Sequence, residues 1–441
     1  MNRSEILSIL SDWNFWTKDQ PTGIKRHHYI VRLENLLGTG QVVVISGVRR
    51  SGKSFLMRQV IQALMSKGVP KNQILMVNFD DPRFATLDTA ALEQLFQTYM
   101  ESLQPSDTPY IFLDEIQEVT GWEKWVRMMH ELRKAKIVIS GSNARLLSGE
   151  LATLLTGRHM DLNVFPLSFE EFLEFNNMST QNLDEITLVS RMTRIRALLY
   201  DYLEFGGFPE VTLTDQKKPL LLSYYDDILN RDLIRRFHLR RPESLKAIGK
   251  FCMSNVASQM TFRSLGRFAQ ATGNTAEKFS SYLESAYLLF FLKRFSFAVR
   301  EQEKSPRKVY SIDIGLSNAV GFRFSQNVGR VAENVVFLTL RRHAASNPNL
   351  ELFYWKDAMQ HEVDFVVKDG LKVRELIQVS WNVSDPRTRQ REINALVRAM
   401  KELGVNEALV VTEDEDKTEE FDKSKIKFAP LWKWLLKYER G

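Results

Sequence analysis

The chain of 441 residues contains a single cysteine, Cys252. One thiol cannot form a disulfide within the chain, and it cannot supply a cysteine-based metal cluster. The seven histidines are scattered, and none of them has the spacing of a metal-ligand motif. These absences exclude a disulfide framework and favour the reducing cytoplasm as the compartment.

Long apolar runs are also missing from the sequence. No uninterrupted apolar stretch approaches the ~18 residues that a membrane-spanning helix needs. The first residues lack the continuous apolar core of a signal peptide, because Glu5 and Asp12 interrupt it. We therefore expect no membrane partner.

The overall composition is that of a globular protein, with 44% hydrophobic and 26% charged residues. At about 100–200 residues per domain, the length predicts two to four domains. The formal net charge is +6 and the isoelectric point is near 9.1. Such a charge permits contact with nucleic acid but does not require it.

The strongest motif is GVRRSGKS at residues 47–54, which fits the pattern G-x-x-x-x-G-K-[ST]. It follows the aliphatic run VVVI and Ser46, and it precedes residues with helical apolar spacing, so it joins a buried strand to a helix. Glycines at these positions let backbone N–H groups converge on an anion at a helix N-terminus. In this pattern the lysine reaches the β- and γ-phosphates of a nucleotide and the final hydroxyl ligates Mg²⁺. The predicted ATP-binding residues are Gly47, Val48, Arg49, Arg50, Ser51, Gly52, Lys53 and Ser54.

An acidic pair ends a second apolar run, in the segment PYIFLDEIQEV. Ligands of open α/β sheets bind at the carboxyl ends of the strands, which is where Asp114 and Glu115 stand. We expect Asp114 to hold Mg²⁺ through water and Glu115 to act as the general base on the attacking water.

A third apolar run, KIVISGSN from Lys136, ends in the polar residues Ser140, Ser142 and Asn143. We expect this strand end to lie between the two motifs and Asn143 to contact the attacking water or the γ-phosphate. Strands alternate with helical segments over this part of the chain, which predicts βαβ units and a parallel sheet.

Two arginines, Arg145 and Arg158, follow the third strand. Either could neutralise charge on the γ-phosphate, within its own chain or across an interface between two copies of the chain. We take Arg158 as the candidate catalytic arginine, which makes a homo-oligomer a candidate assembly. The alternative is a solvated surface arginine.

Four strings in this order, GVRRSGKS, IFLDEIQ, SGSNARLLSGELATLLTGR and FPLSFEEF, resemble a family of bacterial and archaeal AAA-like ATPases. Members of that family carry a C-terminal restriction-endonuclease-like domain of poorly defined function. The resemblance implies an α/β fold with a P-loop NTPase parallel sheet, a helical lid, a winged-helix segment and a PD-(D/E)xK-like tail. We expect these parts at residues 1–165, 166–240, 241–305 and 306–441, respectively.

The segment from Pro242 to Phe297 reads as helix, turn, helix and an apolar strand pair. In helix-turn-helix units the second helix enters the major groove of DNA. Here that helix is expected to begin near Asn274, with Lys278 and surrounding arginines available for phosphate contacts. The alternative is a winged helix that packs only against protein.

In nucleases of the PD-(D/E)xK type, a helix glutamate, a strand aspartate and a following [DEQ]-x-K motif bind Mg²⁺. Glu333, Asp364 and Gln378 match the first three roles by position, but the lysine is missing because Val379 and Ser380 follow Gln378. Glutamine is also a weaker ligand of Mg²⁺ than a carboxylate. We therefore expect a degenerate, non-cutting module, unless a lysine from elsewhere enters the site; the candidates are Lys356, Lys368 and Lys372.

The leading hypothesis is an ATP-hydrolysing switch or motor that uses ATP and Mg²⁺ and acts on DNA or on a DNA-associated partner. One alternative is an ATP-gated, Mg²⁺-dependent DNA nuclease. The other is a signalling-type NTPase that acts only on protein partners.

Overall fold

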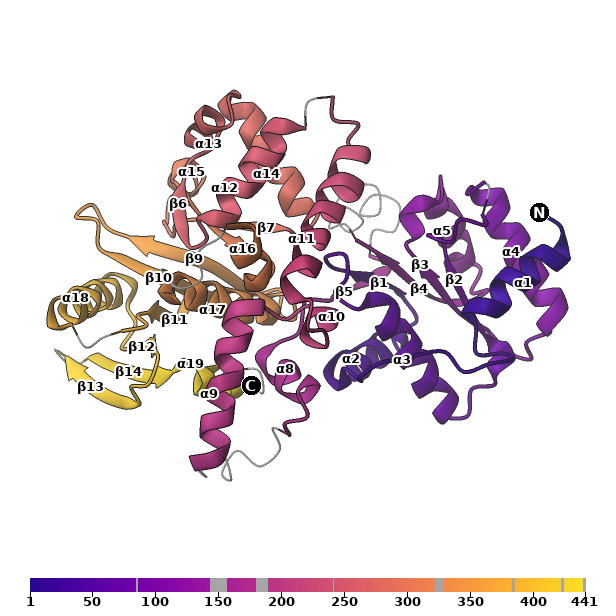
Figure 1. Ribbon diagram of the computed structural model, residues 1–441, viewed down its shortest axis with the longest axis horizontal. Helices are drawn as coiled ribbons and strands as arrows, with labels where there is room; N and C mark the ends of the chain where they lie inside the picture. The colour runs from indigo at the N-terminus through magenta and orange to yellow at the C-terminus, as the bar shows by residue number, and fades with distance from the viewer. Residues whose placement is uncertain are drawn as a thin grey trace. The chain divides into compact units, whose positions relative to one another are not determined.

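The computed structural model describes residues 1–84, 86–142, 157–179, 189–240, 242–321, 328–382, 385–421 and 424–438. The chain forms two units, which we call the amino-terminal unit (Met1–Val164) and the carboxy-terminal unit (Phe165–Gly441). Each unit is described by itself (Figure 1). Within the described residues, none of the helices combines the length and the apolar character needed to cross a membrane.

A five-stranded sheet in which every pairing is parallel forms the centre of the amino-terminal unit, in the order β2-β3-β4-β1-β5. This confirms the parallel α/β sheet that the alternation of strands and helices predicts. Strand β4 separates the strand before the phosphate loop (β1) from the strand that ends in the acidic pair (β3). The strands are β1 (Val42–Ser46), β2 (Ile74–Asn78), β3 (Tyr110–Asp114), β4 (Lys136–Gly141) and β5 (His159–Asn163).

Helices cover both faces of this sheet, because alternate residues of each buried strand point to opposite sides. Val42 and Val44 of β1 pack in one core with the first group of helices, and Val43 and Ile45 pack in a second core with the other group. The first group is α1 (Arg3–Trp13), α4 (Thr89–Leu103) and α5 (Trp122–Glu131); the second is α2 (His27–Leu37) and α3 (Lys53–Ser66) (Figure 1).

At the start of the carboxy-terminal unit, the segment predicted as the lid consists of helices. They are α8 (Phe169–Phe175), α9 (Val189–Phe205), α10 (Pro209–Thr212), α11 (Lys217–Asp227) and a π-helical stretch (Ile228–Arg235). Three further helices follow: α12 (Glu243–Ser254), α13 (Phe262–Phe268) and α14 (Gly273–Ser285).

A small antiparallel sheet, in the order β6-β8-β7, accompanies helices α12 to α14. Strand β8 lies after residue 305, in the part of the chain expected to form the tail, yet it pairs with both strands of the preceding segment. The strand pair expected before residue 297 therefore uses a partner from further along the chain. The bounds are β6 (Ser258–Met260), β7 (Leu289–Leu292) and β8 (Arg307–Ser311), with α15 (Val299–Lys304) between the last two.

A six-stranded mixed sheet, in the order β13-β14-β12-β11-β10-β9, makes the rest of this unit β-rich. Its strands are β9 (Leu350–Lys356), β10 (Glu362–Asp369), β11 (Lys372–Val379), β12 (Glu407–Thr412), β13 (Lys417–Phe421) and β14 (Ser424–Pro430). Its helices are α16 (Ile314–Gly321), α17 (Val328–Ala344), α18 (Pro386–Leu403) and α19 (Leu431–Tyr438).

Close backbone contacts join the turn after α9 to the start of α16. A Cβ atom on Gly315 would lie 1.9 Å from the carbonyl oxygen of Phe205, so only glycine fits there. The buried carboxylate of Asp313 accepts hydrogen bonds from the N–H of Gly207 (2.7 Å) and of Leu316 (3.0 Å). The glycine-rich break that the sequence places in the lid is thus fixed to a segment more than 100 residues later.

We expect Gly315→Ala to lower the free energy of unfolding by about 3 kcal/mol or more, because the added methyl group must displace backbone rather than a flexible side chain. Gly273→Ala is the matched control. Its Cβ would meet only ordinary van der Waals contacts at 3.6 Å or more, and alanine favours the helix that begins there. Denaturant titration of both variants measures the difference. Equal stability of the two variants would contradict this account.

Candidate nucleotide-binding site

The phosphate loop runs from the end of β1 to the start of α3, as the motif predicts. The loop needs glycine at position 47, because a Cβ atom there would lie 2.1 Å from the carbonyl oxygen of Val164. Gly52 has φ +97° and caps the N-terminus of α3. The loop therefore ends at a helix N-terminus, where exposed N–H groups and the helix dipole favour an anion.

Lys53 is the first residue of α3 and is buried. Its Nζ donates hydrogen bonds to the carbonyl oxygens of Gly47 (3.0 Å) and Val48 (3.2 Å). The ammonium group is thus folded back onto the loop, and it belongs to the same short segment that would surround a phosphate.

Sequence reasoning missed Arg26, a buried residue that braces the phosphate loop from outside the motif. Its guanidinium donates to the carbonyl oxygen of Ser51 (3.0 Å), and its backbone N–H donates to Oε1 of Gln59 in α3 (3.1 Å). Arg26 lies 25 residues before its loop partner, and no spacing rule in the sequence connects the two.

Asp114 is fully buried at the carboxyl end of β3. One carboxylate oxygen, Oδ1, accepts a hydrogen bond from the hydroxyl of Ser140, while Oδ2 is buried without a hydrogen-bond partner. The pKa of Asp114 is raised above its usual value, chiefly by burial and then by the neighbouring charge of Glu115. The hydroxyls of Ser140 and Ser54 and the charge of Lys53 oppose this rise but do not outweigh it. A buried oxygen without a donor, close to a hydroxyl and an ammonium, suits a carboxylate that helps to hold a hydrated Mg²⁺.

Glu115 follows Asp114 in a left-handed backbone conformation, with φ +53°. This conformation is uncommon for a residue other than glycine, and such strain gathers at functional sites. The N–H of Glu115 donates to Oγ of Ser140 (3.2 Å), and its side chain accepts a hydrogen bond from the amide of Gln117. Ser140, at the end of β4, therefore contacts both members of the acidic pair. Asn143, the residue predicted for this strand end, lies outside the described residues.

The structure places Arg158 away from the phosphate loop. Arg158 directly precedes β5, and its carbonyl oxygen accepts a hydrogen bond from the N–H of Val42, at the amino end of β1 (3.1 Å). The loop follows the other end of β1, so the backbone of Arg158 and the loop are about 16 Å apart along five strand residues. The guanidinium forms an ion pair with Glu131. This placement argues against a direct role of Arg158 in the site of its own chain.

The phosphate loop itself contains two arginines. Arg49 forms an ion pair with Asp80 at 3.5 Å, and the backbone of Arg50 has φ +69°. Arg50 and Glu115 are thus two residues other than glycine near this site that adopt the left-handed conformation.

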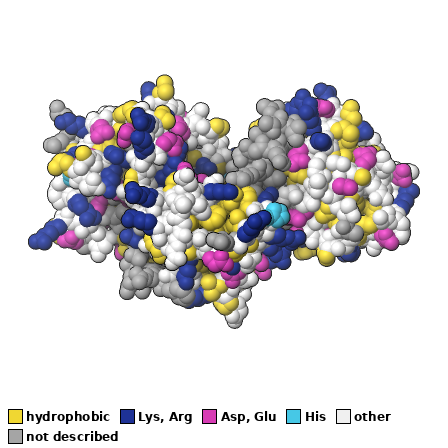
Figure 2. Space-filling model, turned by 90° about the horizontal axis from the view of Figure 1, so that it is seen from above, with side chains coloured by type: hydrophobic (Ala, Val, Ile, Leu, Met, Phe, Trp, Pro, Cys, Tyr) yellow, Lys and Arg dark blue, Asp and Glu magenta, His cyan; other side chains and the backbone are white. Residues whose placement is uncertain are grey.

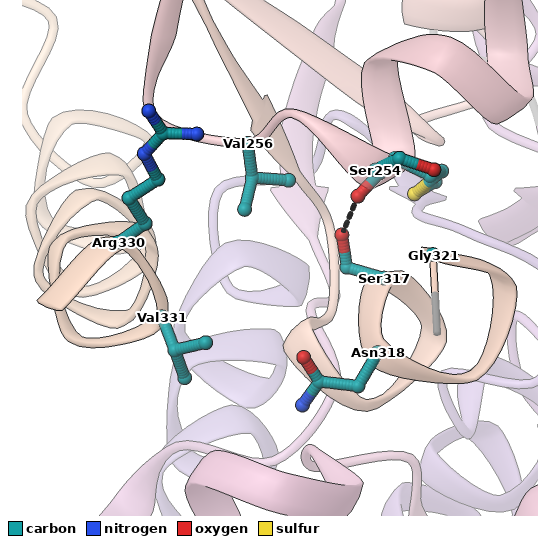
Figure 3. Close-up of a pocket in the computed structure, with 8 residues that line it drawn as sticks. Ser254, Val256, Ser317, Asn318, Gly321, Arg330 and Val331 are labelled. Carbon is teal, nitrogen blue, oxygen red and sulfur yellow. Dashed lines mark hydrogen bonds between the residues drawn. The ribbon is translucent and has the colours of Figure 1, made fainter. Parts of the chain in front are cut away.

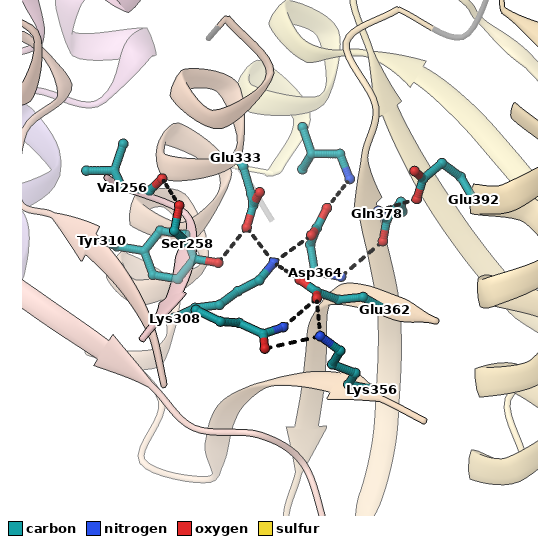
Figure 4. Close-up of polar contacts among 12 residues, drawn as sticks. Val256, Ser258, Lys308, Tyr310, Glu333, Lys356, Glu362, Asp364, Gln378 and Glu392 are labelled. Carbon is teal, nitrogen blue, oxygen red and sulfur yellow. Dashed lines mark hydrogen bonds and ion pairs between the residues drawn. The ribbon is translucent and has the colours of Figure 1, made fainter. Parts of the chain in front are cut away.

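The residues predicted for a second site, in the tail, do come together (Figure 4). The backbone N–H of Asp364 donates to Oε1 of Gln378 (3.0 Å). A lysine does enter this cluster, but it is none of the three candidates from the sequence. Lys308 of β8 contacts both Glu333 (2.8 Å) and Asp364 (2.7 Å).

None of the three candidate lysines from the sequence lies at the centre of the cluster. Lys356 reaches only the edge of the cluster, 3.7 Å from Glu362, and Lys368 pairs with Glu351. Lys372 is exposed at the start of β11.

One surface hollow in the carboxy-terminal unit is lined by other residues, some of them on α17, the helix that carries Glu333 (Figure 3). Val256, Asn318, Arg330 and Val331 are among its lining residues. Ser317, also in the lining, uses its hydroxyl to donate to the carbonyl oxygen of Met253 (2.6 Å). Among the described residues, no carboxylate, histidine or cysteine belongs to this lining, and the hydroxyls of Ser254 and Ser317 both donate to backbone carbonyl oxygens.

The strand order and the loop together define a P-loop nucleotide-binding fold in the amino-terminal unit. The family model described as an AAA domain matches residues 39–173. Two models of domains of unknown function, DUF8612 and DUF4143, match residues 196–327 and 328–434.

Two uncharacterized proteins are similar along most of their length. One, from Methanocaldococcus jannaschii, is 34% identical over 92% of this chain and 90% of its own. The other, from Haemophilus influenzae, is 32% identical over 82% of this chain and 88% of its own. The chain therefore belongs to the same protein family as these two, and it carries an AAA domain.

Solved structures with weaker likeness include the Walker-type ATPase of Pyrococcus abyssi, with a TM-score of 0.41 and 15% identity over 70% of this chain and 99% of that one. Another is the ORC1 protein of Aeropyrum pernix in complex with DNA, with a TM-score of 0.30 and 13% identity over 73% of this chain and 96% of that one.

Proposed function

We propose that this protein binds ATP in the loop at residues 47–54, hydrolyses it with Mg²⁺, and works as a nucleotide-driven switch or motor. The observation that carries the proposal is the buried Oδ2 of Asp114, which has no hydrogen-bond partner. Asp114 ends β3, and only β4 separates β3 from β1, the strand that leads into the phosphate loop with its buried Lys53. The hydroxyl of Ser140 accounts for Oδ1 of this carboxylate, and a metal ion in the nucleotide site would account for Oδ2.

Binding of nucleotide would use groups that now bond to one another. The Lys53 ammonium would exchange its contacts with the Gly47 and Val48 carbonyls for the β- and γ-phosphates, while the loop N–H groups bind the same anion. Ser54 and Asp114 would hold Mg²⁺. The ion, when bound, neutralises charge that develops on the phosphate oxygens.

Glu115 is the proposed general base. Its backbone is held by Ser140 and its carboxylate by Gln117, so the side chain is positioned before any substrate arrives. A base fixed in this way can take the proton of an attacking water without a prior rearrangement.

The test is Mg²⁺-dependent release of phosphate from ATP by the purified chain. We expect Asp114→Asn to lower turnover at least about 10²-fold, because the metal loses a charged contact. Asp107→Asn, at an exposed position three residues before the same strand begins, is the matched control and should behave as the wild type. If wild-type protein releases no phosphate, or if both variants turn over equally, the proposal fails.

DNA is the proposed macromolecular partner, because the turn between α13 and α14 leads into a helix that exposes Asn274, Lys278 and Ser281 along one face. Arg263 and Arg267 are exposed on α13. Figure 2 shows lysines and arginines spread among acidic side chains over one face of the molecule, so the proposal rests on the two helices and not on a broad basic patch.

We expect DNA affinity to fall steeply as salt rises, and we expect Lys278→Ala to reduce the slope of log K against log salt by about 1. Lys401→Ala, an exposed lysine on α18, should leave that slope unchanged. Fluorescence anisotropy with duplex DNA measures both. Absence of DNA binding would instead favour the alternative in which the ATPase acts only on protein partners.

A trans role for Arg158 is proposed, since its side chain is 41% exposed and β5 is an edge strand. We expect chains with Arg158→Ala, mixed with chains with Lys53→Ala, to regain turnover at mixed interfaces. An arginine supplied across an interface contributes about 10³–10⁵ in rate. A mixture of Lys53→Ala with Glu115→Gln contains no intact site and should stay inactive. Normal turnover of the Arg158→Ala enzyme alone would remove this residue from the mechanism.

A further inference from the structure

The cluster in the tail is organised around one lysine (Figure 4). Lys308 is buried, and its Nζ lies 2.8 Å from Glu333, 2.7 Å from Glu362 and 2.7 Å from Asp364. An ammonium group has three N–H donors and no acceptor. Each of the three carboxylates therefore has one donor available from the same nitrogen.

The remaining acceptors of this cluster are also largely used. Oδ2 of Asp364 accepts from the backbone N–H of Val379 (2.9 Å), and the Glu333 oxygen that faces the lysine also accepts from the hydroxyl of Tyr310 (2.7 Å). The second oxygen of Glu362 accepts from the amide of Gln259.

Gln378 is engaged at both ends of its amide. Its carbonyl oxygen accepts from the N–H of Asp364, and its amide nitrogen donates to Glu392 (2.7 Å). Both polar atoms of this amide therefore already bond within the protein. Within the described residues, no group of three or more histidine, cysteine or acidic side chains is arranged to hold a metal ion.

We infer that the Lys308 ammonium is the resident cation of this cluster, and that it stands where the sequence pattern places Mg²⁺. The residues do not fit a divalent ion while the lysine is present, because the ion and the ammonium need the same carboxylate oxygens. An ammonium displaced by such an ion would lose its three carboxylate partners while it is still buried, which is costly.

The positions of these residues give the lysine a structural role. Lys308 lies on β8 of the three-stranded sheet, while Glu333 lies on α17 and Asp364 on β10 of the six-stranded sheet. Gln259 of β6 contacts Glu362 of β10 in the same way. The ion cluster thus joins the two sheets. Burial lowers the pKa of Lys308, but the charges of Asp364 and Glu333 outweigh it and hold that pKa well above its usual range.

The decisive variant is Lys308→Met, compared with the wild type by thermal unfolding and by calorimetric titration of Mn²⁺ without nucleotide. We expect the variant to unfold at a lower temperature, to bind Mn²⁺ at least about 10-fold more tightly than the wild type, and to regain several degrees when Mn²⁺ saturates it. Lys356→Met, at the edge of the cluster, is the matched control and should gain no Mn²⁺ binding. A folded Lys308→Met protein without Mn²⁺ binding would overturn the inference.

If Lys308→Met does not fold, the wild type and Asp364→Asn decide the matter. We expect both proteins to bind Mn²⁺ equally weakly in the calorimetric titration. We also expect that neither protein cleaves duplex DNA when a metal ion is added. Mn²⁺ binding or DNA cleavage by the wild type that Asp364→Asn abolishes would overturn the inference, and it would make Lys308 the missing lysine of an active nuclease.

Discussion

Lys53→Ala is expected to abolish detectable nucleotide binding, with a dissociation constant for ATP raised at least about 10²-fold. The phosphates lose their main cationic contact, and a charge-assisted pair of this kind is among the stronger hydrogen bonds in proteins. Calorimetric titration with ATP and Mg²⁺ measures the effect. Because Lys53 also bonds to the carbonyls of Gly47 and Val48, thermal unfolding should be recorded in parallel.

Lys67→Ala supplies the control for this experiment. Lys67 directly follows α3, at the end away from the loop, and forms an exposed ion pair with Glu34. Its removal should leave ATP affinity unchanged. Near wild-type affinity in a folded Lys53→Ala protein would show that residues 47–54 are not the nucleotide site.

Glu115→Gln is expected to keep ATP bound and to lower turnover about 10²- to 10⁴-fold. The amide preserves the shape of the side chain but cannot take a proton from water. The expected signature is an unchanged dissociation constant together with loss of phosphate release in single-turnover measurements.

The matched control is Glu118→Gln, which makes the same chemical change at an exposed position three residues later. It should turn over as the wild type does. Phosphate release at the wild-type rate by Glu115→Gln would place the base elsewhere, with Asp114 as the first residue to test.

Local patterns in the sequence determined much of the amino-terminal unit. The run at residues 42–45 is apolar because both faces of β1 are covered. In the turn that follows, Gly47 leaves room for a neighbouring backbone carbonyl and Gly52 adopts a positive φ. The acidic pair directly ends the apolar run of β3, so this local pattern also predicts its place at the end of a strand. Strand, turn and helix signals act over a few residues, so one sequence is enough to read them.

Contacts between distant segments decided the rest. The sequence predicts that the end of β4 lies between the two motifs, but only the tertiary structure shows that Ser140 contacts both Asp114 and Glu115. Only the tertiary structure places Arg158 at the opposite end of the strands. In the tail, the resemblance to PD-(D/E)xK nucleases pointed to Glu333 and Asp364 but not to the lysine that contacts them. Lys308 lies 25 and 56 residues from them, and it reaches them through pairing of β8 with other strands. Strand pairing depends on the packing of whole faces and leaves no short-range spacing in the sequence, so the cation at the centre of that cluster was decided by the tertiary structure alone.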